Sequence, residues 1–105
     1  MDFSRYTSRN VFQIVLIRLI MKIQLRFFAS VREKLGVSEE TAELPSDVKT
    51  VGDVRTWLCA RGGLWAEVLA EDRALRTAYQ HVMCDAAEVV TEGSEVAFFP
   101  PVTGG

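Results

Sequence analysis

The sequence has little of what usually marks a small enzyme or a metal protein. It has no glycine-rich loop of the kind that binds nucleotide phosphates, and no nucleophile elbow. His81 is the single histidine, and we expect it to be structural or at the surface. Cys59 and Cys84 lie far apart without a CxxC spacing, which argues against a zinc site or a disulfide scaffold and favours reduced thiols in a cytoplasmic protein. We therefore expect no self-contained active site, and no metal or cofactor held by this chain alone.

A strong excess of one charge is also missing. The formal net charge of the 105 residues is -2 at pH 7, and the basic residues are scattered. Nucleic-acid binding calls for clustered lysine and arginine, so no nucleic-acid partner is expected. Val11 to Ile20 is apolar but is interrupted by Gln13 and Arg18. This run is shorter than the roughly 20 apolar residues that span a bilayer, so no membrane partner is expected either.

The first twenty residues differ from the rest of the chain. Arg5 and Arg9 precede the apolar run, but no small-residue cleavage site follows it, so a secretory signal is not indicated. Met21 then opens a segment with the pattern of a domain start. We expect an N-terminal extension over residues 1–20, which an upstream start codon would explain, and one domain over residues 21–105. If the extension is ordered, the run Val11 to Ile20 would add a strand or helix that covers apolar surface, of this chain or of another copy.

The domain begins with a strand pattern. From Met21 onward, apolar residues alternate with others as they do in a strand that has one face on a core. One face carries Ile23, Leu25 and Phe27, and the other carries Lys22, Gln24, Arg26 and Phe28. Ser30 and Glu33 have the spacing of a capping box, which predicts a short helix that ends at Gly36. Glu39 to Leu44, closed by Pro45, predicts a strand at or near a sheet edge.

A second capping box predicts the main helix. Thr50 and Asp53 have the required spacing, and the apolar positions Val51, Val54, Trp57 and Leu58 follow at helical intervals. Gly62-Gly63 is typical of a helix stop, and Leu64 to Ala70 predicts a further helical segment.

The last third is strand-like. The sequence predicts a strand from Tyr79 to Cys84, a turn near residues 85–87, a short strand over residues 88–90, a turn at residues 92–94, and a strand from Glu95 to Phe99. Strands before and after a long helix favour an α+β domain with that helix laid across one face of the sheet.

The C-terminus carries the strongest local signal. Pro100 and Pro101 have no N–H to donate, so strand pairing must end there and the chain leaves in a stiff, extended form. A tail of residues 101–105 follows and ends in Gly104-Gly105. Because glycine has no side chain, this end fits a slot that is too narrow for any other residue. A terminal carboxylate is ionised at neutral pH and is a poor electrophile, so its use as a reagent requires activation by another protein.

Two segments resemble a known family. Met21 to Glu33, MKIQLRFFASVRE, and the closing EVAFFPPVTGG resemble the small subunits of molybdopterin synthase, the sulfur carriers of molybdenum cofactor synthesis. The resemblance covers residues 21–105, and the ending FFPPVTGG is its most specific part.

The resemblance implies a ubiquitin-like β-grasp fold and a role for the tail. It implies that an activating enzyme adenylates Gly105 with ATP, that a sulfur donor protein converts it to a thiocarboxylate, and that Gly104 keeps the approach slim. Sulfur then passes to the cyclic pyranopterin precursor inside the large subunit, where the dithiolene forms. Sulfur donation to another pathway such as thiazole synthesis, conjugation to lysines, and an inert ubiquitin-like interaction module remain as alternatives.

Strand alternation also predicts a partner face. If Val96 and Phe98 face the core together with Val82 and Cys84, then Phe99, Ala97 and Met83 face the other way, as Phe28 does. Such an exposed apolar patch usually marks an interface, unless the extension or a loop covers it. With the family resemblance, the expected partner-binding residues are Phe28, Arg32, Met83, Phe99, Pro100, Pro101, Val102 and Thr103.

Overall fold

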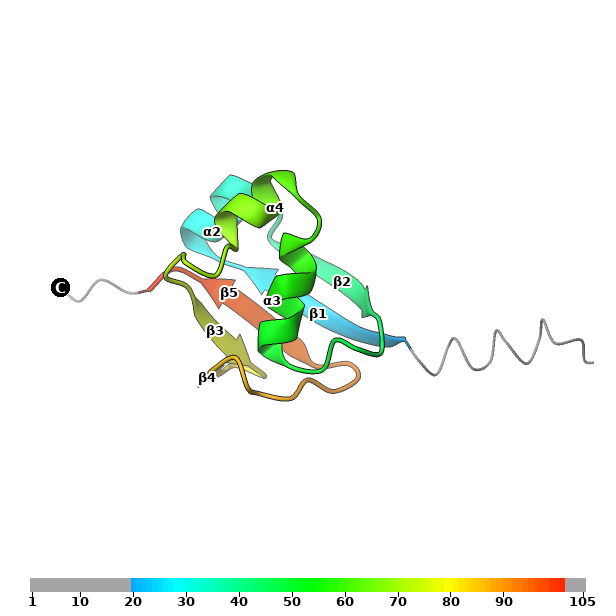
Figure 1. Cartoon of the computed structure of the whole chain (residues 1–105). Coiled ribbons are helices and arrows are strands. Elements are labelled where there is room, and N and C mark those ends of the chain that lie inside the picture. The colour runs from blue at the N-terminus through cyan, green and yellow to red at the C-terminus, as the bar shows by residue number, and fades with distance from the viewer. Residues whose placement is uncertain (1–19, 102–105) are drawn as a thin grey trace, which may run out of the picture.

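The fold is a five-stranded mixed sheet with three helices on one face (Figure 1). The structure is a computed structural model and describes residues 20–101. In chain order the elements are β1 (Met21–Phe27), α2 (Ala29–Leu35), β2 (Glu39–Leu44), α3 (Val51–Cys59), α4 (Gly63–Val68), β3 (Arg76–Tyr79), β4 (Val82–Cys84) and β5 (Glu95–Phe99). The strand order is β2-β1-β5-β3-β4. The predicted α+β class, with the main helix across the sheet, is confirmed.

The centre of the sheet is a parallel pair. β1 pairs with β5 in parallel, with Leu25 opposite Val96 and Phe27 opposite Phe98. All four of these side chains are at most 1% exposed. The strands form because their alternate residues bury apolar surface. Since both strands point the same way, Ile20 and Pro101 lie at opposite ends of the sheet (Figure 1).

The helices close the core from one side. The Phe27 ring stacks on Phe98 with centroids 6.1 Å apart and meets Trp65 edge-on at 5.5 Å. The guanidinium of Arg61 lies over the rings of Trp57 and Trp65 and forms a bidentate pair with Glu40. This arrangement fastens α3 and α4 to the edge strand β2.

The capping box at the start of α3 is present as predicted. The Asp53 backbone N–H donates to Thr50 Oγ1 at 3.1 Å, and Asp53 Oδ2 accepts from the backbone of Thr50 at 3.1 Å and of Lys49 at 3.0 Å. The N–H groups of Lys49 and Thr50 lower the pKa of Asp53 because they stabilise its ionised form. Val51, Val54 and Leu58 are buried in the core, as the helical spacing predicts.

The capping box predicted at Ser30 is wrong. The helix α2 begins two residues earlier than that box requires, at Ala29, with Phe28 rather than Ser30 as N-cap and no side-chain cap. The backbone oxygen of Phe28 accepts the first hydrogen bonds, from Val31 at 3.1 Å and Arg32 at 3.3 Å. Ser30 is therefore inside the first turn, where its hydroxyl cannot cap. The predicted end is right, because Gly36 closes α2 with φ of 73°.

Gly62-Gly63 forms a corner between two helices rather than the stop of one. α3 ends at Cys59 with Ala60 as its C-cap in a right-handed conformation. Gly62 and Gly63 have φ of 77° and 55°, and α4 begins at Gly63. The helical segment predicted after the corner is confirmed.

The single strand predicted from Tyr79 to Cys84 is wrong. It is a hairpin in which β3 and β4 flank a turn at Gln80-His81, both with positive φ, 50° and 68°. Neither residue is a glycine or asparagine, so the turn gave no signal in the sequence. β4 is an edge strand, and Val82 is 67% exposed rather than in the core, although Cys84 does pack against the core. The strand predicted over residues 88–90 is reduced to one bridge between Thr50 and Val89.

Candidate functional site

The face of the sheet without helices carries the candidate site, which we call the open face. The strand register sets Arg26, Ala97, Ala78 and Met83 in one row across β1, β5, β3 and β4. Phe99 lies opposite Arg76 in the next row, and Phe28 directly follows β1. The residue alternation therefore brings Phe28, Met83 and Phe99 to one face. Arg32 is not part of it, because it lies on α2 on the helix side of the sheet.

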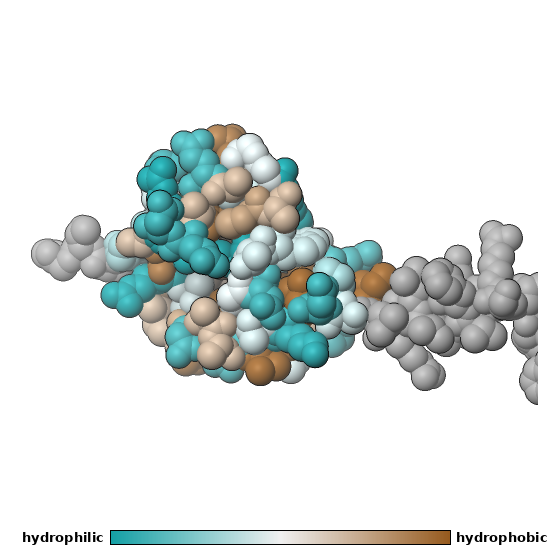
Figure 2. Space-filling model, in the orientation of Figure 1, coloured by the Kyte–Doolittle hydropathy of each residue, from teal (hydrophilic) through white to brown (hydrophobic). Residues whose placement is uncertain are grey.

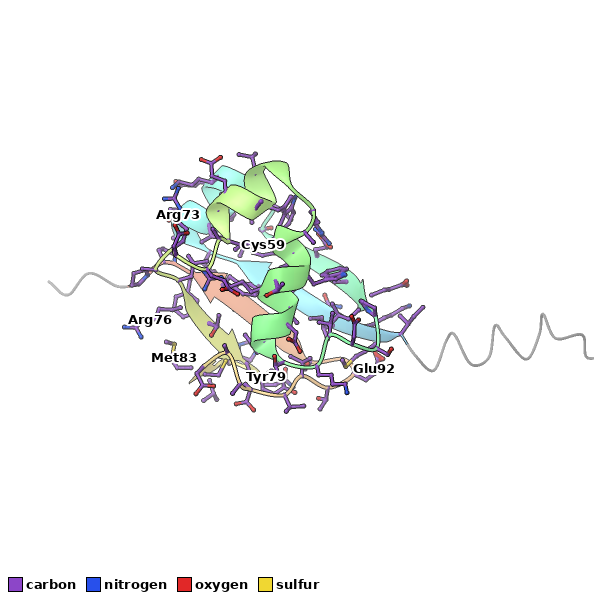
Figure 3. All side chains as sticks on the ribbon, in the orientation of Figure 1. Cys59, Arg73, Arg76, Tyr79, Met83 and Glu92 are labelled. Carbon is purple, nitrogen blue, oxygen red and sulfur yellow. The ribbon has the colours of Figure 1, made fainter. Side chains whose placement is uncertain are left out.

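The open face is apolar and partly accessible. Phe28 is 39% exposed and Met83 is 56% exposed, whereas Ala78 and Ala97 are nearly buried between them. Met83 and Arg76 extend outward from β4 and β3, at the sheet edge away from β2 (Figure 3). The helix side presents mainly hydrophilic and intermediate colours in Figure 2, with small separate apolar spots. An exposed apolar patch of this kind usually marks an interface.

A hollow of about 640 Å³ lies in this face and continues to the base of the tail. Its apolar lining is Phe28, Ala29, Ala78, Ala97, Phe99, Pro100 and Pro101. An apolar hollow with a few charged groups at its rim is the usual form of a binding surface.

Arg26 and Glu95 supply the charge at the rim of the hollow, and His81 lies beside them. Arg26 Nη1 lies 3.7 Å from Glu95 Oε1, and His81 Nδ1 lies 3.5 Å from Glu95 Oε2. The Arg26 guanidinium also lies over the Phe28 ring, 5.4 Å from its centroid, while Arg26 Nε is buried without a hydrogen-bond partner. These groups give the hollow one polar side, which limits how a partner can be oriented on it.

The part of the open face over β1 and β2 is polar. On β1 and β2, Lys22 Nζ lies 3.9 Å from Glu43 Oε1, and the side chains of Gln24 and Thr41 exchange hydrogen bonds at 3.0 and 3.1 Å. The face is thus divided lengthwise, with an apolar half over β5, β3 and β4 and a polar half over β1 and β2. A protein docked on the apolar half would have the polar half as its rim.

The base of the tail is held firmly. The Phe28 N–H donates to Phe98 O at 3.2 Å, which extends the β1–β5 pairing past the last residue of β1. Pro100 lines the hollow of the open face and also a second one of about 440 Å³ between α2 and α4. The tail base is therefore accessible from both sides of the sheet. Val102, Thr103, Gly104 and Gly105 lie outside the described residues.

The cysteines offer no nucleophile. Burial raises the pKa of both the Cys59 and the Cys84 thiol, which keeps them protonated at neutral pH. Cys59 Sγ donates to Leu69 O at 3.1 Å, and Cys84 Sγ donates to Thr77 Oγ1 at 3.6 Å. Within residues 20–101 there is no cluster of three metal-ligating side chains. None of the helices in that range is long and apolar enough to cross a membrane.

Comparison with known proteins identifies the family, because the ThiS family model matches residues 25–105. The chain belongs to the ThiS family. It is 41% identical over 83 residues to the molybdopterin synthase sulfur carrier subunit of Escherichia coli, a match over 79% of this chain and 99% of that protein. It is 35% identical over 94 residues to small archaeal modifier protein 3 of Haloferax volcanii, over 81% and 100% of the two chains.

Solved structures agree on the fold of this ThiS-family chain. The solution structure of the Haloferax volcanii HVO 2177 protein superposes with a TM-score of 0.66 at 29% identity, over 83% of this chain and 89% of that one. The ubiquitin-like β-grasp fold that the resemblance implied is confirmed.

Sequence reasoning missed the rim of the hollow. Strand alternation places Arg26 on the open face, but nothing in the sequence joins it to His81, because the hairpin turn that positions His81 was not recognised. The structure also ties this turn to β5. The Gln80 N–H donates to Glu95 O at 3.0 Å, and the Glu95 N–H donates to Gln80 Oε1 at 2.8 Å.

Proposed function

We propose that this chain is the sulfur carrier subunit of a molybdopterin synthase and that it works through a thiocarboxylate on Gly105. The observation that carries the proposal is the continuity between an apolar hollow on the open face and Pro100-Pro101 at the base of a tail that ends in Gly-Gly. One surface serves for docking and the adjoining chain end serves for chemistry. The 41% identity to a carrier subunit over nearly its whole length supports the same role.

The chemistry begins with the terminal carboxylate. A carboxylate oxygen of Gly105 attacks the α-phosphorus of ATP in an activating enzyme, and pyrophosphate leaves. The resulting acyl adenylate has a good leaving group. Sulfur delivered by a sulfur donor protein at the oxidation level of sulfide attacks the acyl carbon, the bond to AMP breaks, and a thiocarboxylate is left on Gly105. ATP is held by the activating enzyme in this scheme.

The loaded tail then acts as a cosubstrate. The large subunit of the synthase receives Gly104-Gly105 together with the cyclic pyranopterin precursor, and sulfur transfer builds the dithiolene. The carrier leaves with a carboxylate on Gly105 and can be loaded again. The chain contributes the reacting atom, whereas its partners contribute the pockets and the activation, so it is not an enzyme by itself. We place these steps in the cytoplasm, where free thiols such as Cys59 and Cys84 stay reduced.

Mass spectrometry tests the proposal. Incubation with ATP, the activating enzyme and a sulfur donor should add to the C-terminal peptide the mass difference between sulfur and oxygen, and omission of ATP should prevent the change. Deletion of Gly105 should abolish loading and leave the unfolding curve unchanged, because the deleted residue lies beyond the core. An intact Gly105 that is never modified would favour an inert interaction module.

A second function is protein conjugation, which the 35% identity to a small archaeal modifier favours. Activation would then be the same, but lysine amines would attack the adenylate or a thioester derived from it. Incubation of the activated chain with cell extract separates the two functions. Isopeptide-linked products with Gly105 at the junction would support the modifier, whereas a thiocarboxylate without such products supports the carrier.

A further inference from the structure

The open face is the sheet surface that residues 20–101 leave without a cover. The core face is covered by α2, α3 and α4, which bury Ile23, Leu25 and Phe27. No described helix lies on the opposite face (Figure 1). Phe28 and Met83 are exposed there. Phe28 lines the hollow, and Met83 lies opposite Ala78, which also lines it. Apolar surface of this kind gains free energy when a second apolar group covers it.

The chain itself carries an apolar segment of suitable length. In the run Val11 to Ile20, all residues except Gln13 and Arg18 are apolar. This run lies outside the described residues apart from Ile20, which directly precedes β1. The seven residues of β1 extend over roughly 23 Å at the usual rise of a strand. Ten extended residues span up to about 33 Å, so the run can reach along the open face from Ile20 to the hollow.

Charge favours the same placement. Residues 1–20 contain Arg5, Arg9 and Arg18 against Asp2, a formal charge of +2, and the remaining residues carry -4 of the total of -2. The strand register places Glu39, Glu43 and Glu95 on the open face together with three cations, Lys22, Arg26 and Arg76. The excess of negative charge belongs to the domain as a whole, and it attracts a basic segment rather than repelling it.

We propose that the apolar run of residues 11–20 docks on the open face of its own domain and occupies the hollow until a partner displaces it. A tethered segment has a high effective concentration at a site on the same chain, so weak contacts suffice to hold it. Under the proposed function, which this inference extends, the hollow is also the docking surface for the large subunit. The extension then competes with the partner and lowers its affinity.

The first test uses the isolated full-length chain and needs no partner. Met83 is the reporter, because hydrogen peroxide oxidises methionines according to their exposure. The variant Val15→Asp with Leu16→Asp should release the run and raise the Met83 oxidation rate by about 3-fold or more, as followed by peptide mass spectrometry. The control Thr7→Asp with Asn10→Asp adds the same charge outside the run and should behave like wild type. Equal rates in all three proteins would overturn the inference.

The second test measures affinity for the cognate large subunit by calorimetry. Release of the run in the Val15→Asp, Leu16→Asp variant should tighten binding by about 5-fold or more, since an occupied site reduces apparent affinity by the fraction occupied. Unchanged or weaker binding would contradict competition. If no variant binds but Met83 is protected as stated, the proposed function fails and the inference stands. A third outcome is that protection of Met83 from oxidation increases with protein concentration and that gel filtration shows a dimer. The run then covers a second copy of the chain, and the intramolecular proposal is wrong.

Discussion

The two faces of the sheet are built from the same strands but differ in how deeply their side chains are buried. On β5, Phe98 is fully buried beneath the helices, whereas the next residue, Phe99, is half-buried and lines the hollow. The covered face holds the fold together through close packing. The open face carries aromatic and thioether groups that stay accessible. A single-residue step along a strand thus separates a fully packed side chain from an accessible one.

The largest effect should come from truncating the covered face. Phe98→Ala removes a side chain that is 0% exposed and stacks on Phe27, so it should lower the free energy of unfolding by about 3 to 5 kcal/mol. Urea denaturation measures this loss. Phe99→Ala is the matched control, with an expected change below about 1 kcal/mol. A comparable loss at both positions would break the distinction between the faces.

The next effect belongs to the open face. Phe99→Glu should weaken binding to the large subunit by about 10- to 100-fold, since it buries a charge in an apolar contact. Stability should change by less than about 1 kcal/mol. Thr41→Glu introduces the same charge on the polar half of the open face and should retain most of the affinity. If calorimetry gives equal affinities for wild type and Phe99→Glu, Phe99 is not part of the interface.

A smaller effect on stability is expected from alanine substitution at the two predicted capping boxes, and it should differ between them. Thr50→Ala removes the side-chain acceptor for the Asp53 N–H and should cost about 1 kcal/mol. Ser30→Ala should change stability by less than about 0.5 kcal/mol, because Ser30 caps nothing in α2. Thermal or urea unfolding of the two variants checks the difference. A loss at Ser30 as large as that at Thr50 would mean that α2 begins elsewhere.

The smallest effect is a pH dependence at the start of α3. The folded pKa of Asp53 lies below its ordinary value of 3.8. The ionised form is thus favoured by folding, and this contribution is present above the unfolded pKa and is lost as pH falls through the folded pKa. The stability gap between wild type and Asp53→Asn should therefore be larger near pH 6 than below about pH 3.5. If the stability difference between the two proteins stays constant over this pH range, Asp53 does not contribute to the pH dependence of stability.

The sequence predicted best where packing and local chemistry agree. Ile23, Leu25 and Phe27 alternate in β1 and are all buried, and Thr50 and Asp53 cap α3 through local hydrogen bonds. Where several neighbours decide a conformation, the sequence was insufficient. Gln80-His81 adopts positive φ without a glycine or asparagine, because bonds to Glu95 hold the turn. Val82 is on the face that alternation predicts, but no helix extends over the edge strand to bury it.

The site shows the same division. Phe99, Pro100 and Pro101 could be placed beside one another from the linear motif, since they are contiguous in the chain and all line the hollow. The role of the tail that follows them stays a prediction. The polar rim could not be predicted, because Arg26, His81 and Glu95 come from three separate segments and meet only through the sheet register.

The position of β5 between two neighbours has a mechanical consequence. Tension applied at Pro101 would act along the axis of β5, which is hydrogen-bonded to β1 on one side and to β3 on the other. A force in this direction shears the β1–β5 and β5–β3 hydrogen bonds at the same time. These hydrogen bonds therefore resist the force together and do not open one by one. β5 is therefore a firm anchor for the part of the chain that follows Phe99.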